Sequence, residues 1–363
     1  MTVLKVAYLV EQCWHRVPGG TAVATAEIAN ALIRRSDIEL NGIAARHKSL
    51  PDVQLPEDLR INYSKLPRQL LYRSWKSLNL PKAESLNTGA DLVHASGGAI
   101  PPTRLPLIST IYDLAWRHNP SWFPPRGRYF AEKWLQNSYK ADLVMCPSET
   151  TRLDLIEAGF DAKKIHIVPL GVRQRKVDNK SIQLLRQTYG LEESFVLWMG
   201  TIEPRKNLPT LIEAISKIPK VNLVLVGPSG WKVDVEEITK PIKDRVRVIG
   251  KVDEKTKHMW LEAADVFCFP SILEGFGLPV IEAMSHGTPV VTSVNTATAE
   301  VAAGSSLLID PEEPEEIAEA ILKILKNQDL SKELSEAGRE RSKKFSWENS
   351  AELIVEAYKE VVR

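Results

Sequence analysis

The sequence predicts an α/β protein with two doubly wound parallel-sheet domains, and three features lead to this assignment. Short apolar runs alternate with helical patterns along the whole chain, as in parallel sheets that are covered on both faces. At 363 residues, the chain has room for two domains of about 150 residues each. Residues 141–149 and 264–274 also share one pattern, in which an acidic residue, an apolar strand and Pro-Ser follow each other. Two similarly built halves would collect ligands beyond the carboxyl ends of their strands.

The expected strands are short apolar runs that are bounded by turn residues. In the first half they are 3–10, 91–96, 106–112, 142–148 and 165–172. In the second half they are 195–200, 222–227, 245–250, 265–271, 289–293 and 306–310. Helical periodicity is expected over 21–35 and 207–218, and a cap sequence after Phe345 begins a last helix that ends at Val362.

The polar segment 173–181 is expected to link the two halves. The first domain is accordingly assigned to residues 1–172 and the second to residues 173–345. The helix within 346–363 follows the second domain, and its place at the chain end would permit it to cross back onto the first.

Composition narrows the class of protein. Hydrophobic residues make up 44% of the chain and charged residues 26%, which is ordinary for a globular protein. The three cysteines, Cys13, Cys146 and Cys268, have neither paired nor metal-ligand spacing. No apolar run is long enough to span a bilayer, and residues 1–10 lack the apolar run of a signal peptide. We therefore expect a reduced, cytoplasmic protein with no nucleic-acid partner.

The segment 273–291 places two glutamates around a glycine turn. Glu274 precedes Gly275-Phe276-Gly277, which favours a loop, whereas residues 279–286 favour a helix that contains Glu282. The amides at the start of this helix would be exposed at the positive end of the helix dipole, which is a common anion site.

Two carboxylates beside an amide-lined anion site indicate a ligand that is part phosphate and part polyol, such as a nucleotide sugar. Carboxylates accept hydrogen bonds from neighbouring hydroxyls, while backbone amides bind phosphate. An alternative stays open, in which Glu274 only complements the helix dipole and Glu282 is solvated.

Four motifs carry a resemblance to a known family. They are "PGGTAVATAEIANAL" at 18–32, "VPLGV" at 168–172, "GTIEPRKNLPTLIEA" at 200–214 and "EGFGLPVIEAM" at 274–284. In this order they resemble a retaining glycosyltransferase of family 4 with the GT-B fold, and the resemblance covers nearly the whole chain. It implies two Rossmann-like domains that face a cleft, with the acceptor site mostly on the first and the nucleotide-sugar site mostly on the second.

The resemblance also implies roles for individual residues. Glu282 would bind the ribose hydroxyls and Glu274 a hydroxyl of the donor sugar, with Glu274 acting in catalysis. Arg205 and Lys206 would pair with the diphosphate and neutralise charge on the leaving group, a form of electrostatic catalysis. Backbone groups at the two glycine-rich turns would approach the sugar and the phosphates; they belong to Gly19, Gly20, Gly275, Phe276, Gly277 and Leu278. Taken alone, the two cations could be a solvated pair before a helix, and the Gly-Gly pair a plain turn.

On the acceptor side, one residue departs from the family pattern. The family often has histidine before Asp113, and this chain has Tyr112. Tyrosine can donate a hydrogen bond to a sugar hydroxyl, but it does not carry a proton near neutral pH as histidine does. His118 could compensate in part, or be a loop or acceptor-side residue. Two further residues, Trp14 and His15, could line the acceptor site, although tryptophan is commonly a packing residue.

No Asp-x-Asp occurs in the chain, so the usual carboxylate pair for a diphosphate-bound metal ion is missing. We therefore expect no metal and no cofactor besides the nucleotide sugar as co-substrate. The resemblance implies retention by attack on the face from which the phosphate leaves, without a protein nucleophile. Two alternatives stay open: another nucleotide-sugar enzyme, such as an epimerase or an inverting transferase, and a binding protein without turnover.

The segment 60–82 carries six basic residues and no acidic residue. Within it, Leu71, Trp75 and Leu78 have helical spacing, and a face of this kind flanked by cations suits the surface of an anionic bilayer. The sequence therefore indicates possible peripheral membrane attachment near a lipid-linked acceptor. In the alternative, the apolar stripe packs onto the first domain and the cations are solvated.

Overall fold

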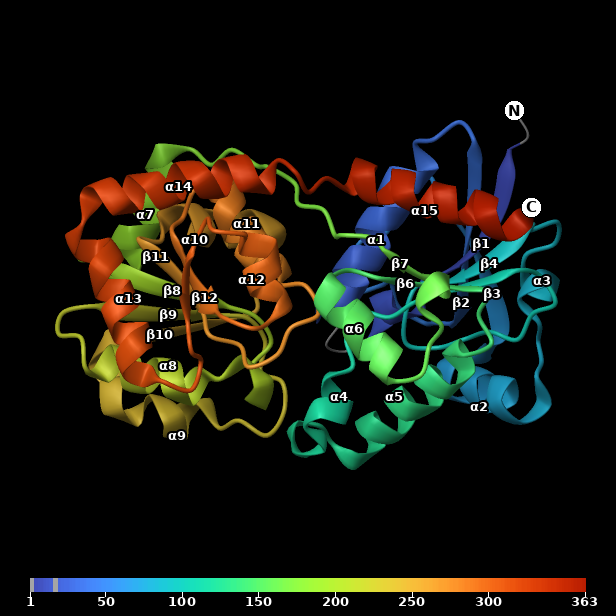
Figure 1. Ribbon diagram of the computed structural model, residues 1–363, viewed down its shortest axis with the longest axis horizontal. Helices are drawn as coiled ribbons and strands as arrows, with labels where there is room; N and C mark the ends of the chain where they lie inside the picture. The colour runs from blue at the N-terminus through green and yellow to red at the C-terminus, as the bar shows by residue number, and fades with distance from the viewer. Residues whose placement is uncertain (1–2, 16–18) are drawn as a thin grey trace. The chain divides into compact units, whose positions relative to one another are not determined.

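The computed structural model describes residues 3–15 and 19–363, which fold into two α/β units (Figure 1). Unit 1 comprises Met1–Gly171 and Trp347–Arg363, and unit 2 comprises Val172–Ser346. Each boundary lies one residue from the position expected from the sequence. The last helix belongs to unit 1, so the chain returns to its first domain after completing the second.

Unit 1 is built on a seven-stranded parallel sheet with the order β3-β2-β1-β4-β5-β6-β7. The order reverses between β1 and β4, which makes the carboxyl ends of these strands the switch point of a doubly wound sheet. The strands are β1 (Leu4–Leu9), β2 (Ile38–Arg46), β3 (Arg60–Pro67), β4 (Leu92–Ala95), β5 (Leu107–Thr110), β6 (Leu143–Cys146) and β7 (Ile165–Ile167).

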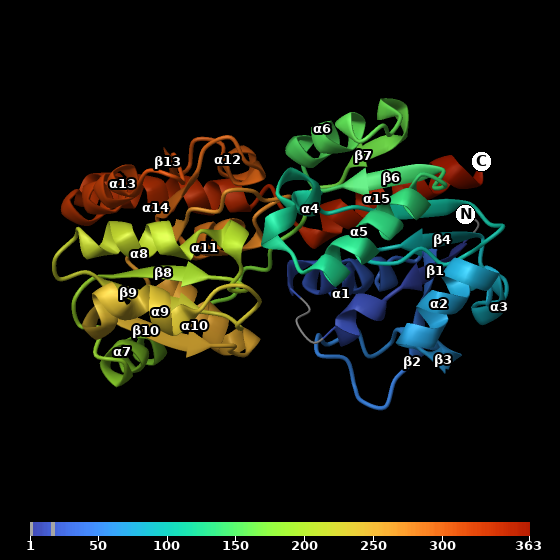
Figure 2. The same ribbon diagram turned by 90° about the horizontal axis from the view of Figure 1, so that it is seen from below.

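The helices of unit 1 cover this sheet (Figure 2). They are η1 (Glu11–Trp14), α1 (Gly19–Ile33), α2 (Arg68–Leu78), α3 (Ala83–Leu86), α4 (Ala115–His118), η2 (Pro120–Trp122), α5 (Pro125–Ser138), α6 (Glu149–Glu157), η3 (Ala162–Lys164) and α15 (Trp347–Val362). A buried polar chain fixes α15 to the sheet: the two ring nitrogens of His94 lie 2.7 Å from the hydroxyls of Tyr358 and Thr110. The pKa of His94 is lowered to about 3 because burial disfavours its charged form.

Unit 2 has a six-stranded parallel sheet with the order β10-β9-β8-β11-β12-β13. Its strands are β8 (Phe195–Met199), β9 (Asn222–Val226), β10 (Val246–Gly250), β11 (Val266–Phe269), β12 (Val290–Ser293) and β13 (Leu307–Ile309). Its helices are α7 (Asn179–Thr188), η4 (Pro204–Lys206), α8 (Leu208–Ser216), α9 (Val235–Thr239), η5 (Lys240–Arg245), α10 (Glu254–Ala263), α11 (Leu278–His286), α12 (Ala297–Ala302), α13 (Pro314–Lys326) and α14 (Gln328–Ser342). The predicted α/β class with two doubly wound parallel sheets is confirmed.

Several local expectations need correction. The predicted linker 173–181 overlaps α7, because Asp178 caps this helix by accepting a hydrogen bond from the Ser181 amide at 2.9 Å. The sequence analysis missed β2, whose Asn41-Gly42 pair reads as a turn, and β3. β3 is polar because it forms the edge of the sheet, where most of its residues are only partly covered.

The apolar stripe of α2 does not face outward as a membrane surface would require. Leu71 and Trp75 are buried in the core of unit 1, whereas Leu78 at the end of the helix is 69% exposed. The interpretation of Leu71 and Trp75 as bilayer contacts is therefore wrong, because these two side chains anchor α2 to its own sheet.

Candidate active site

The first part of the candidate site follows β8, where two glycines let two loops cross closely. A Cβ atom on Gly227, after β9, would lie 1.9 Å from the carbonyl oxygen of Gly200, after β8. Gly227 also has a φ of 140°, a conformation that favours glycine. Beyond this crossing, the chain enters η4, which carries Arg205 and Lys206.

Four charged side chains from two loops form a compact cluster, which we name the charge quartet: Glu203, Arg205, Lys206 and Glu274. Arg205 Nε donates to Glu203 Oε1 at 2.7 Å, and Arg205 Nη1 donates to Glu274 Oε2 at 3.0 Å. Lys206 Nζ donates to Glu274 Oε1 at 2.5 Å. The backbone joins the loops as well, since the Ile272 amide donates to the Arg205 carbonyl oxygen at 2.9 Å. The structure thus brings together both cations and the loop glutamate singled out from the sequence.

Burial sets the electrostatics of the quartet. Lys206 and Glu274 keep only 7% and 6% of their surface exposed. Burial lowers the pKa of Lys206, and the positive charge of Arg205 lowers it further. Burial alone would raise the pKa of Glu274, but Arg205 and Lys206 hold it below its usual value, so this carboxylate is ionised at neutral pH. The alternative of a solvated cation pair is wrong, and so is that of a Glu274 that only complements a helix dipole.

The glycine turn after Glu274 leads into α11 as expected, but its residues are buried rather than exposed. Gly277 has a φ of 100°, and a Cβ atom there would lie 2.6 Å from Thr298 Cγ2. The ring of Phe276 packs edge-on against Phe345, with centroids 5.7 Å apart. Residues 275–278 are all buried. The expected exposure of the amides of Gly277 and Leu278 is therefore wrong, because neighbouring side chains pack against the turn.

Glu282 lies in α11 and is held by a lysine that the sequence analysis missed. Lys257 of α10 donates to Glu282 Oε1 at 2.9 Å and lies 2.9 Å from Glu254 Oε2. Burial alone would lower the pKa of Lys257, but the two carboxylates raise it above its usual value. The side chain of Glu282 is 14% exposed, so the alternative of a solvated Glu282 is wrong. The Glu254-Lys257 spacing was the only sequence signal for this contact, and such pairs are common on helix surfaces.

The far end of α11 is fixed by two buried histidines. His258 Nδ1 and His286 Nε2 lie 2.8 Å apart, and His286 Nδ1 lies 2.6 Å from Glu262 Oε2. Burial, together with Lys257 and His286, lowers the pKa of His258 to about 4. The helix that carries Glu282 is thus bonded to α10 at two points.

On unit 1, another buried carboxylate, Glu11, lies beside two of the acceptor-side candidates, Trp14 and His15. Glu11 Oε2 accepts a hydrogen bond from the Ala45 amide at 2.7 Å and lies 3.0 Å from His47 Nε2. Arg68 Nε is 3.9 Å from Glu11 Oε1, and Arg68 Nη1 donates to the Trp14 carbonyl oxygen at 3.3 Å. These residues follow β1 and β2 or begin α2, so they gather at the carboxyl edge of the sheet.

Trp14 and His15 lie within this cluster. The Trp14 ring stacks on His47 with centroids 4.5 Å apart, and its Nε1 donates to the Ser49 carbonyl oxygen at 3.0 Å. The pKa of His15 is lowered to about 4 by burial and by the neighbouring Arg68 and His47. The sequence analysis missed Glu11, His47 and Arg68 as a group, since each stands beside a different strand.

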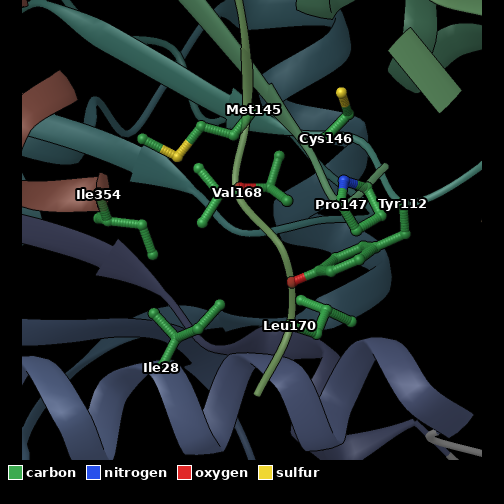
Figure 3. A pocket seen from close by; sticks show the side chains of 9 residues that line it. Ile28, Tyr112, Met145, Cys146, Pro147, Val168, Leu170 and Ile354 are labelled. Carbon is green, nitrogen blue, oxygen red and sulfur yellow. The ribbon is translucent and has the colours of Figure 1, made fainter. Parts of the chain in front are cut away.

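The three remaining acceptor-side candidates, Tyr112, Asp113 and His118, lie in different environments, and Tyr112 is buried. The Tyr112 side chain lines a small cavity of about 10 Å³ together with apolar residues of unit 1, among them Val168 and Leu170 (Figure 3). Burial raises the pKa of Tyr112, so it is a neutral phenol. Asp113 accepts a hydrogen bond from the Ala115 amide at 3.0 Å at the start of α4. His118 is exposed and lies 2.9 Å from Asp154, so the structure pairs it with an acid of α6.

Gly19 and Gly20 open α1 and are exposed. Gly19 has a φ of 59°, which favours glycine, and no atom would contact a Cβ placed there. Pro18, at the start of the same motif, lies outside the described residues.

Residues 3–15 and 19–363 contain neither a membrane-spanning helix nor a cluster of metal ligands. No helix there is both long and apolar enough to cross a membrane. In the same ranges, no group of three or more His, Cys, Asp or Glu side chains is placed to hold a metal ion.

Comparison with known proteins places this chain in a family. The profile described as Glycosyltransferase Family 4 matches residues 18–175, and that described as Glycosyl transferases group 1 matches residues 182–341. The O-antigen chain mannosyltransferase B of Escherichia coli is 30% identical over 292 residues, which span 77% of each chain. A D-inositol 3-phosphate glycosyltransferase of Xylanimonas cellulosilytica is 26% identical over 95% of this chain and 92% of its own. The chain belongs to glycosyltransferase family 4 and is a glycosyltransferase.

Solved structures show the same fold. Sucrose-phosphate synthase from Thermosynechococcus elongatus superposes with a TM-score of 0.79 at 22% identity, covering 98% of both chains. Anabaena HepE, solved in complex with UDP-glucose, gives a TM-score of 0.77 at 20% identity, covering 98% of this chain and all of its own. The two parallel sheets of this chain thus form a GT-B fold, as the resemblance of its motifs implied.

Proposed function

We propose that this protein is a retaining glycosyltransferase that moves a hexose from a nucleoside-diphosphate sugar to an acceptor hydroxyl. The charge quartet carries this proposal, because it gathers two cations and two glutamates beyond the carboxyl ends of β8 and β11. The nucleotide sugar bound to Anabaena HepE supports the donor class. The relatives named as mannosyltransferases support a hexose, and the relative named for the O-antigen chain supports a glycan as acceptor.

In this proposal, the diphosphate competes with carboxylates for two cations that are already in position. Arg205 and Lys206 hold Glu274 and Glu203 at 2.5 to 3.0 Å. An incoming diphosphate would take over part of these bonds, and the released carboxylate of Glu274 would turn to a hydroxyl of the donor sugar. Both cations then neutralise the negative charge that develops on the leaving phosphate.

Glu282 is proposed to bind the ribose through one carboxylate oxygen. Lys257 already donates to Oε1, which leaves Oε2 to accept hydrogen bonds from the ribose hydroxyls. Because Lys257 also contacts Glu254, the carboxylate of Glu282 would be oriented before the nucleotide binds.

Retention follows in the proposed mechanism if the acceptor attacks the face from which the phosphate departs. The leaving phosphate oxygen would take the acceptor proton, so no protein side chain needs to act as a nucleophile. Transfer from a labelled donor, with the anomeric configuration of the product assigned by NMR, tests this step. A product of inverted configuration, an epimerised donor, or tight donor binding without turnover would each reject it.

We further propose that transfer requires no metal ion. Arg205 and Lys206 supply two positive charges close to each other, which is the charge that a divalent cation would bring to a diphosphate. Activity after extensive treatment with EDTA should equal that of untreated protein. Loss of activity that is restored by magnesium or manganese would overturn this part of the proposal.

A further inference from the structure

Polar side chains connect α10 and α11 at two levels, one helical turn apart. At the first level, Lys257 of α10 donates to Glu282 of α11 at 2.9 Å. At the second level, His258 Nδ1 of α10 lies 2.8 Å from His286 Nε2 of α11. Lys257 and His258 are neighbours in the sequence, while Glu282 and His286 are four residues apart and share one side of α11. The arrangement of the two histidines therefore bears directly on the position of Glu282.

Both histidines are almost fully buried, with 5% of His258 and 3% of His286 exposed. His286 Nδ1 lies 2.6 Å from Glu262 Oε2, and Nη2 of Arg339 on α14 lies 3.8 Å from the other oxygen of this carboxylate. We name Glu262, His286 and His258 the histidine chain. A buried nitrogen that loses its partner is costly, so these contacts hold both rings in one orientation. Because both nitrogens of His286 contact α10, the chain fixes the rotation of α11 against that helix (Figure 1).

The acceptor at the end of the histidine chain sets the direction of its hydrogen bonds. An ionised carboxylate only accepts, so His286 donates from Nδ1 to Glu262. Nε2 of a neutral His286 then carries a lone pair and accepts from His258 Nδ1. The pKa of His258 is lowered to about 4 by burial and by the neighbouring Lys257 and His286, so this ring is neutral at neutral pH. Its hydrogen is therefore on Nδ1, and its lone pair is on Nε2.

Glu254 connects the two levels of contact. Its Oε2 lies 2.9 Å from Lys257 Nζ and 3.8 Å from His258 Nε2. A hydrogen on His258 Nε2 would attract this carboxylate toward the histidine and away from Lys257. With a lone pair on Nε2, Glu254 is left to Lys257, which stays between Glu254 and Glu282. The histidine chain thus influences Glu282 in two ways, through the rotation of α11 and through the partner of Lys257.

We propose that the histidine chain positions the carboxylate of Glu282 for the nucleotide. His258 and His286 are positioning residues, because they bond to each other and to Glu262 and act on Glu282 through Lys257 and the helix that they share with it. The consequence for nucleotide binding rests on the proposed function, in which Glu282 binds the ribose. The position of Glu282 itself can be tested without a nucleotide.

A double-variant cycle provides that test. Urea unfolding of the full chain with Lys257→Met, Glu282→Gln and both changes gives the coupling between these two side chains. We expect this coupling to fall by about half or more when His258→Leu is added, because the donor to His286 is lost. It should be retained with His258→Asn, since asparagine has nearly the shape of leucine and its amide donates from near the position of Nδ1. An unchanged coupling with His258→Leu, or an equal fall with His258→Asn, would overturn the proposal.

Nitrogen NMR of the wild-type chain, labelled at histidine, tests the direction of the hydrogen bonds. The signals of the two rings are identified by their loss in His258→Asn and in His286→Gln. At neutral pH, both rings should be neutral with the hydrogen on Nδ1. A His258 ring with its hydrogen on Nε2 would reverse the chain and overturn the proposal. This measurement is made on the wild type, so it decides the matter even if His258→Leu does not fold.

Calorimetry with UDP and with GDP measures the consequence for binding. His258→Leu should weaken the tighter of the two nucleotides about tenfold, and His258→Asn should bind it as the wild type does. Thr288→Val is the matched control, because Thr288 Oγ1 donates to the Leu261 carbonyl oxygen and so joins the turn after α11 to α10 without the histidines. An equal loss of affinity in this control would reject a specific role of the histidine chain. If the cycle and the tautomers agree with expectation but the wild type binds neither nucleotide, the proposed function is wrong and the positioning of Glu282 stands.

Discussion

The buried pair of Lys206 and Glu274 allows stability and catalysis to be separated in one set of variants. Lys206→Met keeps the aliphatic stem of the side chain and removes its ammonium group. Glu274 then loses the partner at 2.5 Å but keeps Arg205 at 3.0 Å. Removing one partner of a buried ion pair costs about 3 to 5 kcal/mol, and we expect the lower value, about 3 kcal/mol, because one cation remains.

The second variant restores the charge balance of the quartet. The native quartet has two cations and two carboxylates, so Lys206→Met leaves one excess negative charge in a buried place. Adding Glu274→Gln removes that charge while Arg205 and Glu203 keep their bond at 2.7 Å. We expect the double variant to regain about 2 kcal/mol of unfolding free energy relative to Lys206→Met, within the range of coupling between contacting residues.

Catalysis should not recover with stability. Each single change removes about 2 to 4 kcal/mol of transition-state stabilisation, which is about 30- to 1000-fold in kcat/KM, and the double variant should stay equally impaired. Urea unfolding of the full chain gives the stabilities. Lys217→Met is the matched control, since its exposed pair with Glu315, 2.8 Å long, should contribute less than about 1 kcal/mol. A double variant that is less stable than Lys206→Met would refute the charge-balance reasoning. A Lys206→Met variant with unchanged kcat/KM would refute the catalytic role of Lys206.

Three further outcomes are expected. Glu282→Ala should weaken binding of the free nucleoside diphosphate in calorimetry about tenfold or more, whereas Glu274→Ala should chiefly lower turnover; equal losses of affinity would reject this division of roles. Lys257→Met should also lower nucleotide affinity, because Glu282 loses the hydrogen-bond donor that orients its carboxylate. Lys255→Met on the same helix is the control and should not lower it. Unchanged nucleotide affinity in Lys257→Met would show that the contact only stabilises α10. The third outcome concerns pH. The pKa of His94 is about 3 in the folded protein and near 6.5 when exposed, so its stabilising contribution is complete above pH 6.5 and is lost as pH falls toward 3. Between pH 6.5 and 5, the wild type should lose about 2 kcal/mol more than His94→Gln in urea unfolding, and parallel pH profiles would contradict the assignment.

The sequence by itself determined the class of fold and the local conformation of the segment that carries Glu274 and Glu282. Continuously apolar strands separated by helices require a parallel sheet with both faces covered, and this local pattern does not depend on the neighbours of each strand. Gly277 and Gly287 flank α11, and both could be placed in turns from the sequence because glycine adopts the left-handed conformation at little cost. Both have that conformation in the structure. Because Glu274 precedes the turn at Gly277 and Glu282 lies between the two glycines, the first could be placed in a loop and the second in a helix.

Only the tertiary structure decided which side chains meet. Lys206 and Glu274 are 68 residues apart, and Lys257 and Glu282 are 25 apart, so their contacts depend on the order of strands in the sheet and on helix packing. The structure also decided which face of α2 is buried, since helical periodicity identifies an apolar stripe without identifying what covers it. Trp75 is therefore a core residue, while Leu80, which lies outside any periodic pattern, is exposed. Local sequence sets the conformation of each segment, and long-range packing sets its environment.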